Sequence, residues 1–103
     1  MSPSDIRLHR LAAAEFRDAL GRYRAKSALT SQRFFNAVET ALQEIADDPA
    51  QWPEFQPGSR WVRVRKFPYV LYYKIDSDSR VRILAVAHTK RRPGYWVRRA
   101  HRP

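Results

Sequence analysis

Residues 81–88 read Val81-Arg82-Ile83-Leu84-Ala85-Val86-Ala87-His88, and this nearly continuous apolar run is the strongest structural signal in the chain. Strands that are buried on both faces have this composition, so the run predicts a central strand of a sheet. The segment before it, Tyr69 to Ile75, is rich in the aromatic and β-branched residues that strands favour. Asp76 to Ser79 lies between the two segments and predicts a turn.

A third strand is predicted just upstream, at Trp61 to Phe67. Within it Val62 and Val64 alternate with Arg63 and Arg65. Because successive side chains of a strand point to opposite faces, the two valines should share one face of the sheet and the two arginines the other. The Pro68 that follows should end this strand and give a tight connection to the next.

Two amphipathic helices are predicted in the first half of the chain. Apolar residues recur there at spacings of four, four and three, which is the pattern of one helix face. The two stripes are Ala12, Phe16, Leu20 and Tyr23, followed by Phe34, Val38, Leu42 and Ile45. Ser27 or Thr30 is expected to be the N-cap of the second helix, and Asp48-Pro49 is expected to end it. The short link near Lys26 to Leu29 predicts an antiparallel helical hairpin.

The remaining segments complete the predicted fold. Ile6 to Leu8 suits a short opening strand, and the three prolines of Pro49 to Gly58 predict an irregular crossing that Trp52 and Phe55 pin to the core. The order of elements predicts an α+β fold, in which an N-terminal strand precedes an antiparallel helical hairpin packed on an antiparallel sheet completed by three C-terminal strands. A length of 103 residues predicts one domain, residues 1–103.

The positive charge of the chain is concentrated in its second half. Arg60 to Pro103 contains 13 Lys and Arg against two acidic residues, a net charge of +11, whereas the first 59 residues have a net charge of −1. Such a surface attracts an anion, either a nucleic-acid phosphate backbone or an acidic protein partner.

Composition narrows the cellular setting. The chain has no cysteine, which excludes disulfides and thiolate metal sites and is compatible with a reducing cytoplasm. It has no apolar run close to the roughly 20 residues that a membrane span needs, and Met1 to Asp5 shows no signal-peptide pattern. We therefore expect a cytoplasmic protein that does not enter membranes.

Metal and cofactor chemistry find little support in the sequence. His9, His88 and His101 lie far apart, no carboxylate cluster accompanies them, and the three glycines form no phosphate-binding loop. We expect no metal site and no cofactor.

Basic and aromatic residues could instead form a site for nucleic acid. Arg63 and Arg65 lie on the first of the three late strands, and the cluster after the last strand contains Lys90, Arg91, Arg92, Tyr95 and Trp96. If those two strands approached each other, cations and aromatic rings would line one concave surface. Cleavage of RNA there would need a base for the 2′-hydroxyl proton, cations for the phosphorane and an acid for the leaving oxygen. Arg63, Arg65 and Arg91 could supply the charge, and His88 or Tyr95 could transfer a proton.

Structural roles compete with these assignments. Arg63 and Arg65 could be an ordinary solvated strand face, and His88 a hydrogen-bonded structural histidine. Tyr95 and Trp96 could cap the core instead of stacking on a base. Arg98-Arg99 could belong to a mobile charged end.

Several motifs resemble the RelE/ParE toxin superfamily of type II toxin–antitoxin, or plasmid-stabilisation, modules. They are Phe67-Pro68-Tyr69-Val70-Leu71-Tyr72-Tyr73, then Ile83-Leu84-Ala85-Val86-Ala87-His88, then Arg92-Pro93-Gly94-Tyr95-Trp96, with the Ala13…Glu15…Ala19…Tyr23 helix, the second helix and the Asp48-Pro49…Trp52-Pro53 exit upstream. The resemblance implies the fold described above. It also implies a bacterial cytoplasmic toxin, held inactive by a cognate antitoxin that an adjacent gene encodes.

The resemblance implies two alternative activities. RelE-like members are metal-independent endoribonucleases that cut mRNA on the ribosome, and Arg63, Arg65, Lys90 or Arg91, and Tyr95 match their catalytic pattern. That pattern also has an arginine where this chain has Val70, which favours the other branch. ParE-like members inhibit DNA gyrase without catalytic residues.

We therefore expect a ParE-like gyrase inhibitor. In this role Arg63, Arg65, Lys90, Arg91, Arg92 and Trp96 would bind the target or the antitoxin. The alternatives are a ribosome-dependent endoribonuclease that uses Arg63, Arg65, His88, Arg91 and Tyr95, and a non-toxic module that only binds an antitoxin or DNA.

Overall fold

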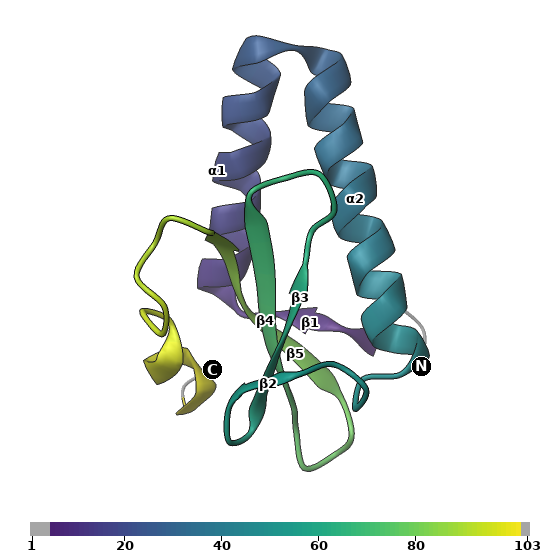
Figure 1. The fold of residues 1–103 in the computed structure, drawn as a ribbon, viewed down its shortest axis with the longest axis vertical. Helices are drawn as coiled ribbons and strands as arrows, with labels where there is room; N and C mark the ends of the chain where they lie inside the picture. The colour runs from purple at the N-terminus through teal and green to yellow at the C-terminus, as the bar shows by residue number, and fades with distance from the viewer. Residues whose placement is uncertain (1–4, 102–103) are drawn as a thin grey trace.

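In the computed structural model, which describes residues 5–101, a helical hairpin packs on a five-stranded sheet (Figure 1). The hairpin consists of α1 (Arg10–Lys26) and α2 (Ala28–Asp47). The strands are β1 (Arg7–Leu8), β2 (Glu54–Gln56), β3 (Ser59–Arg63), β4 (Tyr69–Ile75) and β5 (Val81–His88), and a short 3-10 helix, η2 (Val97–His101), follows. The predicted α+β fold class is confirmed. Neither helix is long and apolar enough to cross a membrane, within the described residues.

The sheet is mixed, which refines the predicted antiparallel sheet. Its strand order is β1-β5-β4-β3-β2, and β1 runs parallel to β5 whereas the other neighbours are antiparallel. The unpredicted strand β2 lies inside the segment that we expected to be irregular. Pro53 and Pro57 limit it to three residues, which is too short for an alternating pattern to be recognised.

The two strands at the centre have the bounds that the sequence predicts, whereas β3 is shorter than predicted. It ends at Arg63, four residues before Phe67, because the chain turns there. Lys66 adopts a left-handed conformation with φ 69°, and the Val64 N–H donates to the Tyr69 carbonyl across the turn at 2.9 Å. Val62 and Val64 are buried on the helix side of the sheet, as predicted.

A single residue, Ser27, connects the two helices. Its Oγ accepts a hydrogen bond from the Thr30 N–H at 3.1 Å, and its own N–H donates to the Tyr23 carbonyl at 2.9 Å. One serine thus caps the end of α1 and the start of α2, and the two helices run antiparallel, as predicted (Figure 1). Asp48 ends α2 immediately before Pro49, as predicted.

The main core fills the space between the hairpin and the sheet. Phe34 is fully buried, with its ring centroid 5.1 Å from those of Phe67 and Tyr69. Trp52 packs against this core, as predicted, and its Nε1 donates to the Glu44 carbonyl at 3.4 Å. The prediction for Phe55 is wrong, because this side chain packs on the opposite face of the sheet and is 37% exposed.

His9 links β1 to the start of α1. Its N–H donates to the Ile83 carbonyl at 2.8 Å, which extends the pairing with β5, and its Nδ1 accepts from the Leu11 N–H at 3.1 Å as the helix N-cap. Burial lowers the pKa of this imidazole, and the nearby Arg99 guanidinium lowers it further. The cap needs the neutral ring, because a protonated Nδ1 cannot accept a hydrogen bond.

We predict that this cap makes the protein sensitive to mild acid. In the pH range from the ordinary histidine pKa of 6.5 down to the lowered folded value, the unfolded chain binds a proton at His9 that the folded chain does not. The free energy of unfolding should therefore fall as the pH drops below that ordinary value. Thermal unfolding of the wild type and His9→Asn at pH 7.5 and 5.5 measures this, because asparagine caps a helix without titrating. An equal loss of melting temperature in both proteins would contradict the prediction.

Candidate functional site

The sheet keeps the two groups of predicted basic residues apart. β4 lies between β3 and β5, so the strand that carries Arg63 does not border the strand that leads to Lys90. The condition for a concave surface between these two strands, their direct approach, is therefore not met in the described part of the chain.

Arg63 and Arg65 are exposed and make separate local contacts. The Arg63 Nε donates to the Phe67 carbonyl of its own turn at 3.2 Å. The Arg65 Nη2 lies 2.9 Å from a carboxylate oxygen of Glu44 on α2, and its side chain remains 75% exposed. Because β3 ends at Arg63, the strand alternation that should place both arginines together does not extend to Arg65.

His88 lies at the end of β5, on the side of the sheet that faces the hairpin. Its ring packs edge-on against Tyr69, with centroids 5.1 Å apart. Its Nδ1 accepts a hydrogen bond from the Lys90 N–H at 3.1 Å. These contacts are those of a structural histidine that holds the turn after β5.

The segment after β5 folds back along the sheet and ends in η2, next to the strands (Figure 1). We call residues 91–101 the C-terminal arm. Trp96 in this arm is fully buried, with its ring centroid 4.6 Å from that of Tyr72 and 5.6 Å from that of Phe55. The predicted binding role of Trp96 is therefore wrong for its side chain, which caps the apolar outer face of the sheet instead.

The arm is ordered by contacts that the sequence did not predict. Lys74 and Arg82 both donate to the Ala100 carbonyl, at 3.2 and 3.0 Å. Arg99 donates to the Leu84 carbonyl at 3.1 Å, and its side chain is only 14% exposed. The interpretation of Arg98-Arg99 as a mobile end is thus wrong for Arg99.

Glu15 of α1 is the centre of this arrangement. Its Oε1 accepts from the Val86 N–H at 3.1 Å and from Arg99 Nη1 at 2.9 Å. Its Oε2 accepts from the Tyr95 hydroxyl at 2.7 Å, from Arg99 Nη2 at 3.2 Å and from Arg91 Nη1 at 3.4 Å. One largely buried carboxylate thus joins α1, β5 and the arm. We call Glu15, Arg91, Tyr95 and Arg99 the Glu15 cluster.

Two of the predicted catalytic residues belong to this cluster. The Arg91 guanidinium carbon lies 3.6 Å from the centroid of the Tyr95 ring, and that of Arg99 lies 5.2 Å from it. Burial raises the pKa of the Tyr95 phenol, and its hydrogen bond to Glu15 raises it further. The hydroxyl therefore holds its proton and directs it to Glu15.

Other candidate residues remain exposed. Lys90 and Arg92 lie in the turn after β5, and no ion pair to either residue is formed within residues 5–101. No group of three or more histidine and acidic side chains is placed to hold a metal ion among the described residues.

The fold and this arrangement define a small α+β domain in which a hairpin covers one face of a sheet and an arm closes the other. The sequence model described as the ParE toxin of type II toxin-antitoxin system, parDE, matches residues 6–93. The chain therefore belongs to the ParE toxin family.

A solved structure shows the same fold. The structure described as the chromosomal ParDE TA system from P. aeruginosa superposes with a TM-score of 0.61 and 21% sequence identity, covering 81% of this chain and 92% of that chain. No curated protein sequence matches this chain.

We predict that Glu15→Gln destabilises the protein by about 2 to 4 kcal/mol, because it leaves the buried Arg99 guanidinium without its countercharge. Glu44→Gln is the matched control. It removes the same charge from the other helix but breaks only the exposed pair with Arg65, which should cost less than about 1 kcal/mol. Urea unfolding of the three proteins measures both values. Equal losses of unfolding free energy in the two variants would show that the Glu15 cluster stabilises the fold no more than an exposed ion pair does.

Proposed function

We propose that this protein is a growth-inhibiting toxin that acts on DNA gyrase by binding and that it does not cut RNA. The observation that supports this proposal is the state of Tyr95. Its hydroxyl is the best placed candidate for proton transfer in the basic region, and it is committed to Glu15 at 2.7 Å. Membership of the ParE toxin family supports the assignment as a toxin.

The chemistry of RNA cleavage argues in the same direction. A general acid works best when its pKa lies near the working pH, and it must reach the leaving oxygen of the substrate. The Tyr95 phenol has a raised pKa and donates inward, and the Arg91 guanidinium covers its ring. His88 is packed on Tyr69 and accepts a backbone hydrogen bond, so it too is engaged in the fold.

Inhibition by binding makes weaker demands on the same residues. It needs an exposed surface with complementary charge, and no proton has to move. Arg63, Lys90 and Arg92 are exposed cations that can supply such a surface. Val70 stands opposite Arg63 in the sheet, at the position where the RNA-cutting pattern has an arginine. The gyrase target itself comes from the resemblance to the ParE-like branch.

The proposal includes a partner. We expect a cognate antitoxin, encoded by an adjacent gene and present in the same bacterial cytoplasm, to hold the toxin inactive. The chain has a net charge of +10, so an acidic antitoxin segment would be attracted to it at long range.

We predict that the purified protein blocks DNA supercoiling by gyrase, or traps cleaved DNA, at concentrations comparable to that of the enzyme. Tyr95→Phe should inhibit within about threefold of the wild type, because the hydroxyl serves the fold and loses only one hydrogen bond. A gel assay of plasmid supercoiling measures both proteins, after circular dichroism has shown that each is folded.

Codon-linked cleavage of mRNA in a translating extract is the opposing result. If the wild type cleaves and Tyr95→Phe does not, the protein is a ribosome-dependent endoribonuclease and the present proposal is wrong. If induced expression without the antitoxin causes no growth arrest, the protein is a binding module without toxicity.

A further inference from the structure

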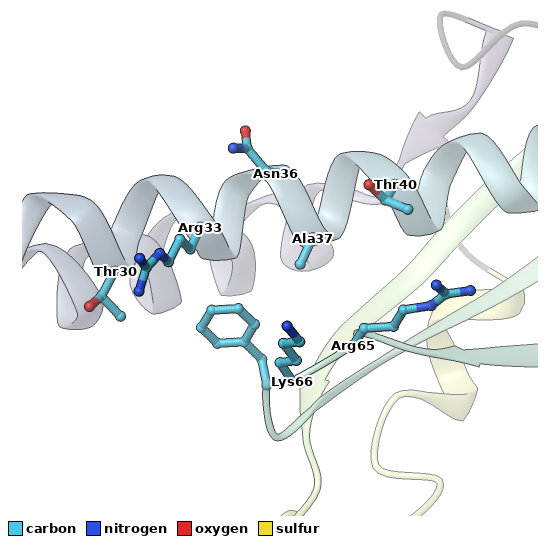
Figure 2. A pocket seen from close by; sticks show the side chains of 8 residues that line it. Thr30, Arg33, Asn36, Ala37, Thr40, Arg65 and Lys66 are labelled. Atoms are coloured by element: carbon cyan, nitrogen blue, oxygen red, sulfur yellow. The ribbon is translucent and has the colours of Figure 1, made fainter.

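A groove of about 640 Å³ separates α2 from the turn between β3 and β4. Its lining includes the three cations Arg33, Arg65 and Lys66 and contains no carboxylate. Figure 2 shows Arg33 and Ala37 on the side of α2 that faces the turn, with Lys66 rising from the turn toward the helix. Positive charge from two separate elements thus converges on one hollow.

The three cations differ in whether they form an ion pair within the protein. Within residues 5–101, neither Arg33 nor Lys66 forms an ion pair with a carboxylate. Arg65 pairs with Glu44 at 2.9 Å, and its side chain is 75% exposed. Arg65 thus already binds one carboxylate at this end of the groove. Because its guanidinium is exposed, a carboxylate of another molecule can also reach it.

The floor of the groove is apolar. Ala37 and Phe67 form part of the lining, and Phe67 is held from beneath by Phe34 and Tyr23, with ring centroids 5.1 and 5.2 Å away. This ring cannot turn outward without losing both contacts. The groove thus offers a well-packed apolar surface between exposed cations.

A second hollow of about 260 Å³ shares Arg65 with the first. Its lining also includes Trp52, Pro53 and Trp61, together with Glu44, the partner of Arg65. Trp61 is 37% exposed although it is one of the largest apolar side chains in the chain. The two hollows meet at Arg65, and we refer to them together as the path, with Arg33 and Lys66 on one side of Arg65 and Trp52 and Trp61 on the other.

We propose that this path binds an acidic segment of a partner protein, with carboxylates at Arg33 and Lys66 and an apolar side chain between Trp52 and Trp61. A phosphate backbone would satisfy the cations but would leave the apolar floor and the aromatic hollow unfilled. A peptide that alternates acidic and apolar side chains satisfies both. Arg65 would exchange Glu44 for a carboxylate of the partner, or would bridge the two.

This inference rests on the proposed function in one respect: the acidic partner that would bind in the path is the antitoxin. It does not depend on the gyrase target. The binding measurement therefore contains no gyrase, and a failure to inhibit gyrase leaves it unaffected.

The test uses the full-length chain and, as the probe, the purified antitoxin encoded by the adjacent gene, in isothermal titration calorimetry. Arg33→Glu/Lys66→Glu should weaken binding by about thirtyfold or more, because two attractive contacts become repulsive. Arg10→Glu/Arg17→Glu is the matched control, with the same change of net charge on exposed positions of α1 outside the path. It should stay within about threefold of the wild type, as expected for screened long-range charge.

A neutral variant controls for misfolding of the charge-reversed variant. Arg33→Gln/Lys66→Asn removes both charges, and asparagine tolerates the left-handed conformation of Lys66. Its affinity should lie between those of the wild type and the charge-reversed variant, with an unchanged melting temperature. Equal weakening by the groove and control variants, or no weakening by either, would overturn the proposal.

A 20-base-pair DNA duplex is the second probe, titrated into the same proteins. If the groove variant loses affinity for the duplex and retains the antitoxin, the path is a nucleic-acid site and the proposal is wrong. If it loses the antitoxin and binds the duplex no more weakly than the control variant does, the proposal stands.

Discussion

The Glu15 carboxylate joins the helical hairpin, the edge of β5 and the C-terminal arm. β1 pairs with β5 only as far as Ile83, and the His9 N–H extends that pairing by one hydrogen bond. Beyond this point no strand among residues 5–101 borders that edge of β5, and the Glu15 side chain supplies the acceptor for the Val86 N–H. A buried charge costs several kcal/mol unless it is paired and hydrogen-bonded. Both carboxylate oxygens are satisfied here, and their remaining partners all come from the C-terminal arm, so one side chain closes the sheet edge and fastens the arm.

This constraint divides the positive charge of the chain into two classes. Arg91 and Arg99 both pair with Glu15, but Arg99 is as buried as its partner whereas the Arg91 side chain remains 53% exposed. The charge of Arg99 is neutralised in the interior, and that of Arg91 is paired at the surface. Arg33, Lys66 and Lys90 face solvent and keep their charge available. The excess positive charge in the second half of the sequence therefore does not form one surface. The position of a residue in a basic segment does not show whether its side chain binds a ligand or stabilises the fold.

The sequence predicted those parts of the fold whose residue pattern is marked within one short segment of the chain. β4 and β5 are long enough for composition and turn residues to mark both ends, and the hairpin follows from two apolar stripes joined at Ser27. The missed features depend on contacts between distant segments. Tyr95 and Arg99 reach Glu15 across 80 and 84 positions, and no spacing rule connects them. Arg65 leaves the strand pattern because Lys66 turns left-handed, which a non-glycine residue gives no reason to expect.

The two candidate surfaces lie over different strands of the sheet. α1 packs over β5, next to the Glu15 cluster, whereas α2 packs over β3, next to the groove of Arg33 and Lys66. A partner bound in that groove would lie beside the turn that carries Lys90 and Arg92, because the Thr89 N–H of that turn donates to the Pro68 carbonyl, next to Phe67 of the groove, at 2.9 Å. It could block a target at that turn by covering it or by changing the conformation of the arm. Because the Glu15 cluster fixes the arm to α1, a conformational route would have to break a buried, multiply hydrogen-bonded carboxylate. Physical coverage by the partner is the less costly route, and it requires no change in the toxin.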